Sequence, residues 1–380
     1  MRKIARAVMI SLVCVMLLSI TGCGRGGARA VEGVLGGYQY TIRMQLVKGA
    51  GTVEFQMAQE MAEEIFRASG GRLNLQVYPL GTFASSMELF NAVIHGVVDI
   101  AANYGTWLRA IDFALHVITT GTMQMCPISK RVWLEEFGGN ELAEELFAQA
   151  GLVWLAMHTD GTEVLMTREP FTSVHDMAGL IFRSSDPRLL NQVGIAGITI
   201  PLEELFTAFQ TGAVDLAEYG HLHINTTMGL SDVANFAIYP DFWNVNNSIA
   251  IVMNQASYNR LPPDLRALLR MAMRGWEFRH FTRTQWASAV TMQELQQAGI
   301  LQVMRIDNPL EFAHLRRLAY TGLEATDAAH YGGNTIRIYQ SFRDFKRIWY
   351  PYRYMSRWWG EGLNPSQQAG FPIDGWPLYY

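Results

Sequence analysis

The segment between residues 40 and 102 alternates between two hydrophobic patterns, and this alternation limits the fold more than any other feature. Strand-like patterns cover three stretches, Tyr40–Leu46, Leu73–Tyr78 and Val97–Ala102. Between them, residues 53–68 and Met87–His95 carry apolar side chains at helical spacing. An order of strand, helix, strand, helix and strand favours a parallel sheet with helices on both faces. We therefore expect an α/β fold whose ligand binds beyond the carboxyl ends of the strands.

The composition is that of a globular chain with a large core. The chain has 380 residues, of which 49% are hydrophobic and 17% are charged. Its formal net charge is −4, and basic residues do not cluster outside the N-terminus, so nucleic acid is not an expected partner. The catalytic motifs G-x-S-x-G, the P-loop and H-E-x-x-H do not occur, and no dinucleotide fingerprint follows a predicted strand. These features favour a binding protein over an enzyme.

The N-terminus has the pattern of a lipoprotein signal peptide, which we assign to residues 1–22. Basic residues at 2–6 precede an apolar run at 7–20, which is short for a membrane-spanning helix. Small residues then precede Cys23, as in a bacterial lipobox, where the cysteine is lipidated. The alternatives are ordinary secretion and an uncleaved anchor. We expect a bacterial lipoprotein on the periplasmic or cell-surface side of a membrane, tethered by the glycine-rich segment 23–37.

The stretch from Asp176 to Tyr219 contains the clearest candidate for a binding residue. An apolar run at 180–182 ends on Arg183, and small polar residues beginning with Ser184 follow. A guanidinium group matches both oxygens of a carboxylate and keeps its charge, so Arg183 is suited to bind a carboxylate ligand. The alternative interpretation is that Arg183 forms a surface ion pair with Asp186.

Several motifs together resemble DctP-type receptors, the extracytoplasmic solute-binding proteins of TRAP transporters. Four pieces resemble the first lobe of these receptors: 69–73, 77–81, 88–93 and 96–100. Asp176–Arg183 resembles the family's D-L-x-G-x-K-x-R stretch, whose arginine binds the substrate carboxylate. Ala208–Glu218 resembles its A-L-Q-x-G-x-V-D-G-x-E stretch. The resemblance covers roughly residues 38 to 350.

This resemblance implies a two-lobed fold like that of periplasmic binding proteins. Each lobe is expected to be a mostly parallel sheet flanked by helices, followed by long C-terminal helices. The expected division assigns 38–157 and 247–278 to lobe I. Lobe II and the linking helices take 158–246 and 279–349, and an aromatic tail occupies 350–380. A long helical pattern also begins at Leu261–Asp264 and runs to about Ala298.

The resemblance also implies that Arg183 holds a small organic carboxylate between the lobes and that a TRAP permease receives it. The pattern is nearest to the branch that binds 2-oxo acids and other monocarboxylates. Further candidate substrate-binding residues lie in loops or at strand ends: Asn103, Tyr104, Asp160, Glu163, Ser184, Glu218, Tyr219, Trp243 and Asn244. The loop at 158–163 could instead be a plain turn, and the aromatic side chain of Trp243 could instead be core packing.

A bridging Na⁺ or Ca²⁺ is not expected, although some relatives of this type use one. Asn244 stands where the resemblance leads us to expect an acidic residue. Glu218, with Glu163, could still supply carboxylate oxygens to a cation. His221 and His223 share a face by strand alternation, but without an evident third ligand they fit cleft lining or surface better than a metal site.

Three other functions fit the same features less completely. The chain could be a sensory lipoprotein that reports its ligand to a signalling partner, a receptor for a more hydrophobic carboxylate, or a structural lipoprotein. The C-terminal tail could also mediate a homodimer. Export, a tether, two α/β lobes and a carboxylate-binding arginine are best explained together by a transport receptor.

Overall fold

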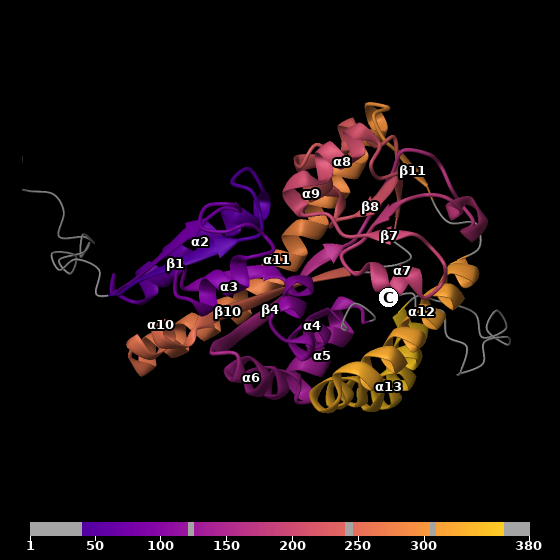
Figure 1. Ribbon diagram of the computed structural model, residues 1–380. Coiled ribbons are helices and arrows are strands. Elements are labelled where there is room, and N and C mark those ends of the chain that lie inside the picture. The colour runs from indigo at the N-terminus through magenta and orange to yellow at the C-terminus, as the bar shows by residue number, and fades with distance from the viewer. Residues whose placement is uncertain (1–39, 121–124, 240–245, 305–308, 361–380) are drawn as a thin grey trace, which may run out of the picture.

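A computed structural model describes residues 40–120, 125–239, 246–304 and 309–360, which form two mixed sheets covered by helices (Figure 1). The first sheet has the order β2-β1-β3-β10-β4. Its strands are β1 (Tyr40–Leu46), β2 (Leu73–Tyr78), β3 (Ile100–Tyr104), β4 (Leu152–Thr162) and β10 (Asn246–Asn254). β1 pairs in parallel with β2 and β3, whereas β10 is antiparallel to β3 and β4.

The second sheet has the order β11-β9-β5-β8-β6-β7. Its strands are β5 (Leu165–Thr167), β6 (Phe182–Arg183), β7 (Gly197–Ile198), β8 (Leu216–Glu218), β9 (Phe236–Ile238) and β11 (Gln302–Met304). β6 is parallel to both β7 and β8, and β5 is antiparallel to β8 and β9. The expected two-sheet α/β fold is confirmed, and the antiparallel pairings occur at the strands next to the crossings between the sheets.

Short helices cover the sheets and connect their strands. In and around the first sheet they are α2 (Val53–Ala68), α3 (Leu89–Ile94), α4 (Phe113–Thr120), α5 (Pro127–Glu136), α6 (Gly139–Gln149) and α10 (Gln255–Arg260). Around the second sheet the helices are α7 (Pro187–Asn191), α8 (Leu205–Thr211) and α9 (Leu222–Thr227). The Thr52 hydroxyl accepts a hydrogen bond from the Phe55 N–H, which caps α2 at its predicted start.

Three long helices extend across the molecule. We call the first sheet with its helices the first half of the molecule, and the second sheet with its helices the second half. α11 (Pro263–Gln297) contacts β4 and α2 of the first half and also α9 of the second, so it joins the two halves. α12 (Pro309–Tyr331) packs against α7, and α13 (Gly333–Gly360) packs against α4 and α5 (Figure 1). Residues 350–360 of the expected tail continue α13, and the remainder of the tail lies outside the described residues.

Two segments differ from the sequence-based expectation. The third strand begins at Ile100 rather than Val97, because Gly96 adopts a φ of 72° after α3 and the chain must finish this turn before it enters the sheet. His221 and His223 do not lie on a strand, because α9 begins at Leu222 and His221 is its N-terminal cap. The alternating pattern predicted that the strand β8 would continue beyond Glu218, so it did not indicate the start of this helix.

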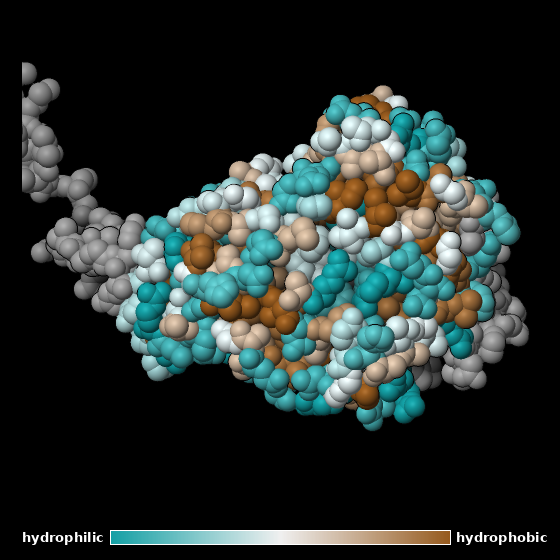
Figure 2. All heavy atoms as spheres, viewed as in Figure 1, coloured by the Kyte–Doolittle hydropathy of each residue, from teal (hydrophilic) through white to brown (hydrophobic). Residues whose placement is uncertain are grey.

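Hydrophobic residues occur both on the surface and along the helices. Hydrophilic and hydrophobic residues are interspersed over both halves on the face shown in Figure 2. Within the ranges described above, no helix is both long and apolar enough to cross a membrane.

Phe182 lies in an apolar cluster of the second sheet with Leu165 and Leu216, and it provides a test of this packing because its side chain is fully buried while that of its neighbour Ile181 is 37% exposed. Phe182→Ala should lower the free energy of unfolding by roughly 3–5 kcal/mol, since it leaves a cavity among packed apolar groups. Ile181→Ala is the matched control and should change it by about 0.5 kcal/mol or less. Urea denaturation of both variants measures the difference, and equal losses would contradict this packing.

Candidate functional site

Arg183 is fixed at the end of β6 by backbone carbonyl groups. Its Nη1 donates to the carbonyl oxygen of Glu218 at 2.5 Å, and its Nε and Nη2 donate to that of Ile200 at 3.3 and 3.2 Å. The side chain is only 1% exposed. Three of its five N–H groups thus find acceptors among the described residues, which leaves one N–H on each terminal nitrogen. A guanidinium that still has N–H groups on both terminal nitrogens can donate them to a carboxylate.

The alternative ion pair between Arg183 and Asp186 is not what the structure contains. The Asp186 carboxylate accepts hydrogen bonds from Arg188, at 2.8 and 2.5 Å, and lies 3.2 Å from Nε2 of His116. Although burial alone would raise the pKa of Asp186, His116 and Arg188 hold it well below its usual range. Arg188 also donates to Asp327 of α12 at 2.8 Å. Asp186 therefore belongs to a separate ionic network that connects α4, α7 and α12.

The carboxylate of Glu218 holds the loop that follows Arg183. Its Oε1 accepts hydrogen bonds from the Ser184 hydroxyl at 2.7 Å, the Ser185 N–H at 2.6 Å and the Ser185 hydroxyl at 2.7 Å. β6 and β8 are adjacent parallel strands. Arg183 therefore donates a hydrogen bond to the backbone of Glu218, while Ser184 and Ser185 donate hydrogen bonds to its side chain. The predicted site residues Arg183, Ser184 and Glu218 are thus brought together.

A second cluster of buried charges lies where strands of the first sheet end. The ammonium group of Lys48, just after β1, lies 2.5 Å from Oδ2 of Asp160 and 3.6 Å from Oε1 of Glu54. The Tyr104 hydroxyl donates to the same Asp160 oxygen at 2.6 Å and accepts from Lys48 at 2.7 Å. Oε2 of Glu54 and Oδ1 of Asp160 are buried, without a hydrogen-bond partner among the described residues.

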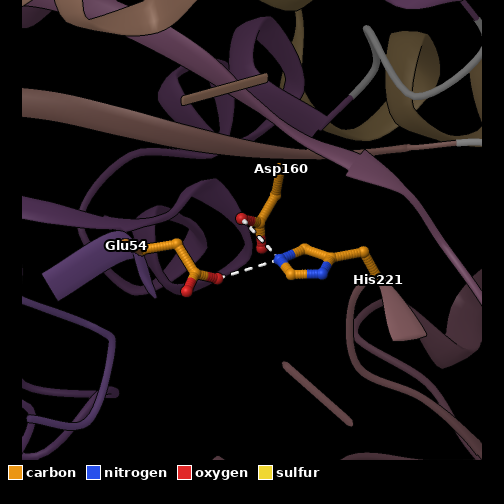
Figure 3. Close-up of side chains that lie close together, drawn as sticks. All are labelled: Glu54, Asp160 and His221. Atoms are coloured by element: carbon orange, nitrogen blue, oxygen red, sulfur yellow. Dashed lines mark hydrogen bonds and ion pairs between the residues drawn. The ribbon is translucent and has the colours of Figure 1, made fainter. Parts of the chain in front are cut away.

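His221 brings the second half of the molecule to this cluster (Figure 3). Its Nε2 lies 2.9 Å from Oε1 of Glu54 and 4.0 Å from Oδ1 of Asp160, and its Nδ1 lies 3.0 Å from the Ser288 hydroxyl of α11. His280 of α11 lies 3.7 Å from the same Asp160 oxygen. The ligand atoms of Glu54, Asp160 and His221 lie within 4.8 Å of one another, which is close enough for a metal site if the Lys48 charge is left out of account. Glu218 is not in this group, and its metal role stays a prediction.

Tyr219 lies between the Arg183 group and the Lys48 group. Its ring is edge-to-face with that of Tyr104, with centroids 6.2 Å apart, and the Lys48 ammonium is 5.7 Å from its centroid. Its hydroxyl is buried without a hydrogen-bond partner among the described residues. The Asn247 side chain donates to Oε1 of Glu163 and to the Tyr219 carbonyl, both at 3.2 Å. The predicted residues Glu163 and Tyr219 are thus held side by side.

The electrostatics of the site follow from burial and from these neighbours. Burial alone would lower the pKa of Lys48, but Asp160 and Glu54 outweigh it and raise the pKa above its ordinary value. Burial likewise opposes ionisation of Glu54, yet Lys48 and His221 hold its pKa below the usual range. Burial raises the pKa of Tyr219 to about 12, so the phenol keeps its proton. For Arg183, burial lowers the pKa, while Glu218 and Glu163 act in the opposite direction.

The remaining predicted residues fall into two groups. Asn103 is satisfied within the first half, because its side chain donates to the Ser86 carbonyl at 2.7 Å and accepts from the Tyr104 N–H at 2.9 Å. Trp243 and Asn244 lie outside the described residues. The sequence analysis missed Lys48 and Glu54, although a lysine after the first strand and an acid on the apolar face of a helix were available signals.

A second buried lysine, Lys130 of α5, lies next to β10. Its ammonium donates to the Ser248 hydroxyl at 2.6 Å. Burial lowers its pKa to about 7, and the opposing effect of Glu277 is weaker. This lysine is therefore close to half-protonated at neutral pH.

The chain is similar to known proteins in sequence. The model of the family described as bacterial extracellular solute-binding protein, family 7 (DctP), matches residues 44–309. A monocarboxylate 2-oxoacid-binding periplasmic protein of Nostoc sp. strain PCC 7120 is 21% identical over 67% of this chain and 70% of its own length. A sialic acid-binding periplasmic protein of Vibrio cholerae is 22% identical over 61% of this chain and 73% of its own length.

Two solved structures have a similar fold. A TRAP periplasmic solute-binding protein of Pseudoalteromonas atlantica, with bound sodium and pyruvate, aligns at a TM-score of 0.75 and 22% identity, over 88% of this chain and all of that one. A counterpart of Colwellia psychrerythraea, with bound calcium and pyruvate, aligns at 0.76 and 21% identity, over 86% of this chain and all of that one.

Lys130 makes stability depend on pH in a predictable direction. Because its folded pKa is about 7, well below that of an ordinary lysine, the folded state loses this proton above pH 7 while the unfolded state keeps it. Stability should therefore rise with pH between 7 and about 10. Compared with Lys130→Met, the wild type should gain about 2 kcal/mol of unfolding free energy from pH 7 to pH 9, measured by urea denaturation at each pH. A constant difference between the two proteins would refute this prediction.

Proposed function

Because this chain belongs to the DctP family of bacterial extracellular solute-binding proteins, we propose that it is the solute receptor of a TRAP-type transporter. In this proposal it binds a small organic carboxylate between its two sheets and delivers it to the membrane permease. Arg183 is the residue that pairs with the carboxylate. Ser184, Glu218 and Tyr219, with Asp160, Glu163, Asn103 and Tyr104, form the surroundings, and Trp243 and Asn244 complete the expected set.

The geometry of Arg183 is the observation that carries this proposal. Its guanidinium group is buried, and the acceptors that fix it are neutral carbonyl groups rather than a carboxylate. The nearby carboxylate of Glu218 is engaged by two serines through its Oε1. A planar cation prepared in this way pairs with a ligand carboxylate without first having to lose the rotational freedom of its side chain.

The ligand class follows from relatives and from charge. The Nostoc relative is described as binding monocarboxylate 2-oxoacids, and both solved structures named above hold pyruvate. Besides Arg183, the buried residues of the two clusters include one lysine and four carboxylates, those of Glu54, Asp160, Glu163 and Glu218. A second carboxylate on the ligand would add repulsion, so we favour a monocarboxylate, of which 2-oxo acids are one class. A more hydrophobic carboxylate is the alternative ligand.

Lobe closure is the proposed mechanism. The lobes are proposed as 38–157 with 247–278, and 158–246 with 279–349 plus the linking helices. The ligand enters between them, Arg183 pairs with its carboxylate, and closure excludes water, which strengthens this ion pair. Closure shifts only by the difference in ligand affinity between the open and closed forms, so the residue that pairs with the ligand also controls closure.

Several parts of the proposal rest on sequence patterns alone. We propose that residues 1–22 are removed, that Cys23 carries the lipid anchor, and that 23–37 tethers the receptor at the outer side of the membrane. The chain would act as a receptor without catalysis. A homodimer could form through the aromatic tail at 350–380. A sensory lipoprotein is the alternative function, and a gene for a sensor kinase instead of permease genes beside this one would favour it.

Loss of Arg183 tests the proposal directly. The ligand is first identified by mass spectrometry of material that co-purifies with the mature protein, supported by a thermal-shift screen of monocarboxylates. Arg183→Ala should then weaken its binding by roughly 100-fold, since truncating one partner of a buried charge pair costs several kcal/mol. Arg183→Lys should also bind weakly, because an ammonium group cannot form the two parallel hydrogen bonds. Isothermal titration calorimetry measures both.

Arg260→Ala serves as the matched control, because this arginine lies on α10 with a side chain 64% exposed. It should bind the ligand like the wild type. Circular dichroism establishes that each variant is folded before titration. Wild-type affinity in a folded Arg183→Ala protein would rule out the proposed role of Arg183.

Cation dependence is the second measurable consequence. Asn244 replaces the expected acidic residue, so ligand affinity should be the same in buffers that contain Na⁺, Ca²⁺, or choline with EDTA. Calorimetry in the three buffers gives the comparison. A loss of affinity of about tenfold or more on removing one cation would contradict it.

A further inference from the structure

The group formed by Glu54, Asp160 and His221 resembles a metal site, but its geometry does not fit a resident metal ion. The Lys48 ammonium is 2.5 Å from Oδ2 of Asp160 and 3.6 Å from Oε1 of Glu54. Any ion bound to both carboxylates would lie against this fixed positive charge. Tyr104 gives a further hydrogen bond to the same Asp160 oxygen. Lys48 therefore already supplies one positive charge where a metal ion would have to bind these two carboxylates.

Lys48 also lies where the two halves of the molecule meet. It follows β1, Glu54 is in the first turn of α2, and Asp160 lies in β4, so all three are positioned by the first sheet and α2, although the proposed lobe boundary at residue 158 falls within β4. His221 follows β8 of the second half and lies 2.9 Å from the Glu54 carboxylate (Figure 3). His280 and Ser288, from the joining helix α11, contact Asp160 and His221 respectively. The acids that Lys48 contacts are therefore the same acids that face the other half.

We propose that Lys48 is a built-in cation that takes the place of a metal ion in this group and holds the two halves together in the conformation described. Its ammonium offsets one of the two negative charges of Glu54 and Asp160 and positions Glu54 to contact His221 across the junction. Because Lys48 is more than 98% buried, its charge cannot be replaced by bulk solvent while the halves are together. This inference concerns residues other than Arg183, so it does not depend on the identity of the ligand.

Exchange of Lys48 for an uncharged side chain of similar length is the test. Lys48→Met leaves two carboxylates and an imidazole within 4.8 Å of one another, which suits Zn²⁺. In EDTA, its melting temperature should fall by about 5–10 °C relative to the wild type. Saturating Zn²⁺ should restore most of this loss, whereas the wild type should shift by no more than about 1 °C. Differential scanning calorimetry of the full mature protein gives both values.

Two further variants make the outcome decisive. Lys130→Met removes the other buried lysine, whose ammonium donates to a serine hydroxyl, and should show no zinc-dependent stabilisation. Lys48→Met combined with Glu54→Gln and Asp160→Asn removes the charge imbalance, so it should fold stably in EDTA even if Lys48→Met alone does not fold. Strong zinc stabilisation of the wild type, a Lys48→Met protein as stable as the wild type, or a triple variant that fails to fold would each overturn the proposal.

Discussion

Burying an ammonium group is tolerable only when carboxylates share its charge, and the centre of this molecule is arranged around that requirement. Lys48 is surrounded by Asp160, Glu54 and Tyr104, which come from three separate elements of the first half. Removing Lys48 would leave two buried carboxylates without their nearest cation. The ends of β1, β3 and β4 are therefore fixed relative to one another, and His221 extends this constraint to the second half.

The two buried cations Lys48 and Arg183 differ in the charge of the groups that contact them, and this difference supports the proposed binding function. Lys48 is neutralised by carboxylates of the protein. The immediate contacts of Arg183 are carbonyl oxygens, which orient the guanidinium without neutralising it. Glu218, the nearest sequence candidate for neutralising it, is held by Ser184 and Ser185. A ligand carboxylate would supply to Arg183 what Asp160 supplies to Lys48.

Local sequence patterns predicted the regular elements well. The boundaries of α2 agree with the helical pattern at 53–68, and α11 ends one residue before the predicted limit. These elements have long periodic faces and strong end signals, which local rules describe. The pattern was less reliable at short elements. Strand alternation predicts that His221 and His223 lie on a continuing strand, whereas a helix begins between them at Leu222. Their rings are parallel, with centroids 6.3 Å apart.

The sequence by itself determined the class of fold, the order of its elements and Arg183 as the binding candidate, because each of these depends on periodicity or on a contiguous motif. The tertiary structure alone decided that Lys48, Glu54, Asp160 and His221 form one cluster. These residues lie far apart in the chain, and only the packing of the two halves brings them together. Likewise, only the fold showed that Asp186 pairs with Arg188 and His116. Arg183 therefore does not pair with Asp186 and donates its hydrogen bonds to backbone carbonyl groups. Which charges neutralise one another depends on distance in space, and local sequence patterns do not contain that distance.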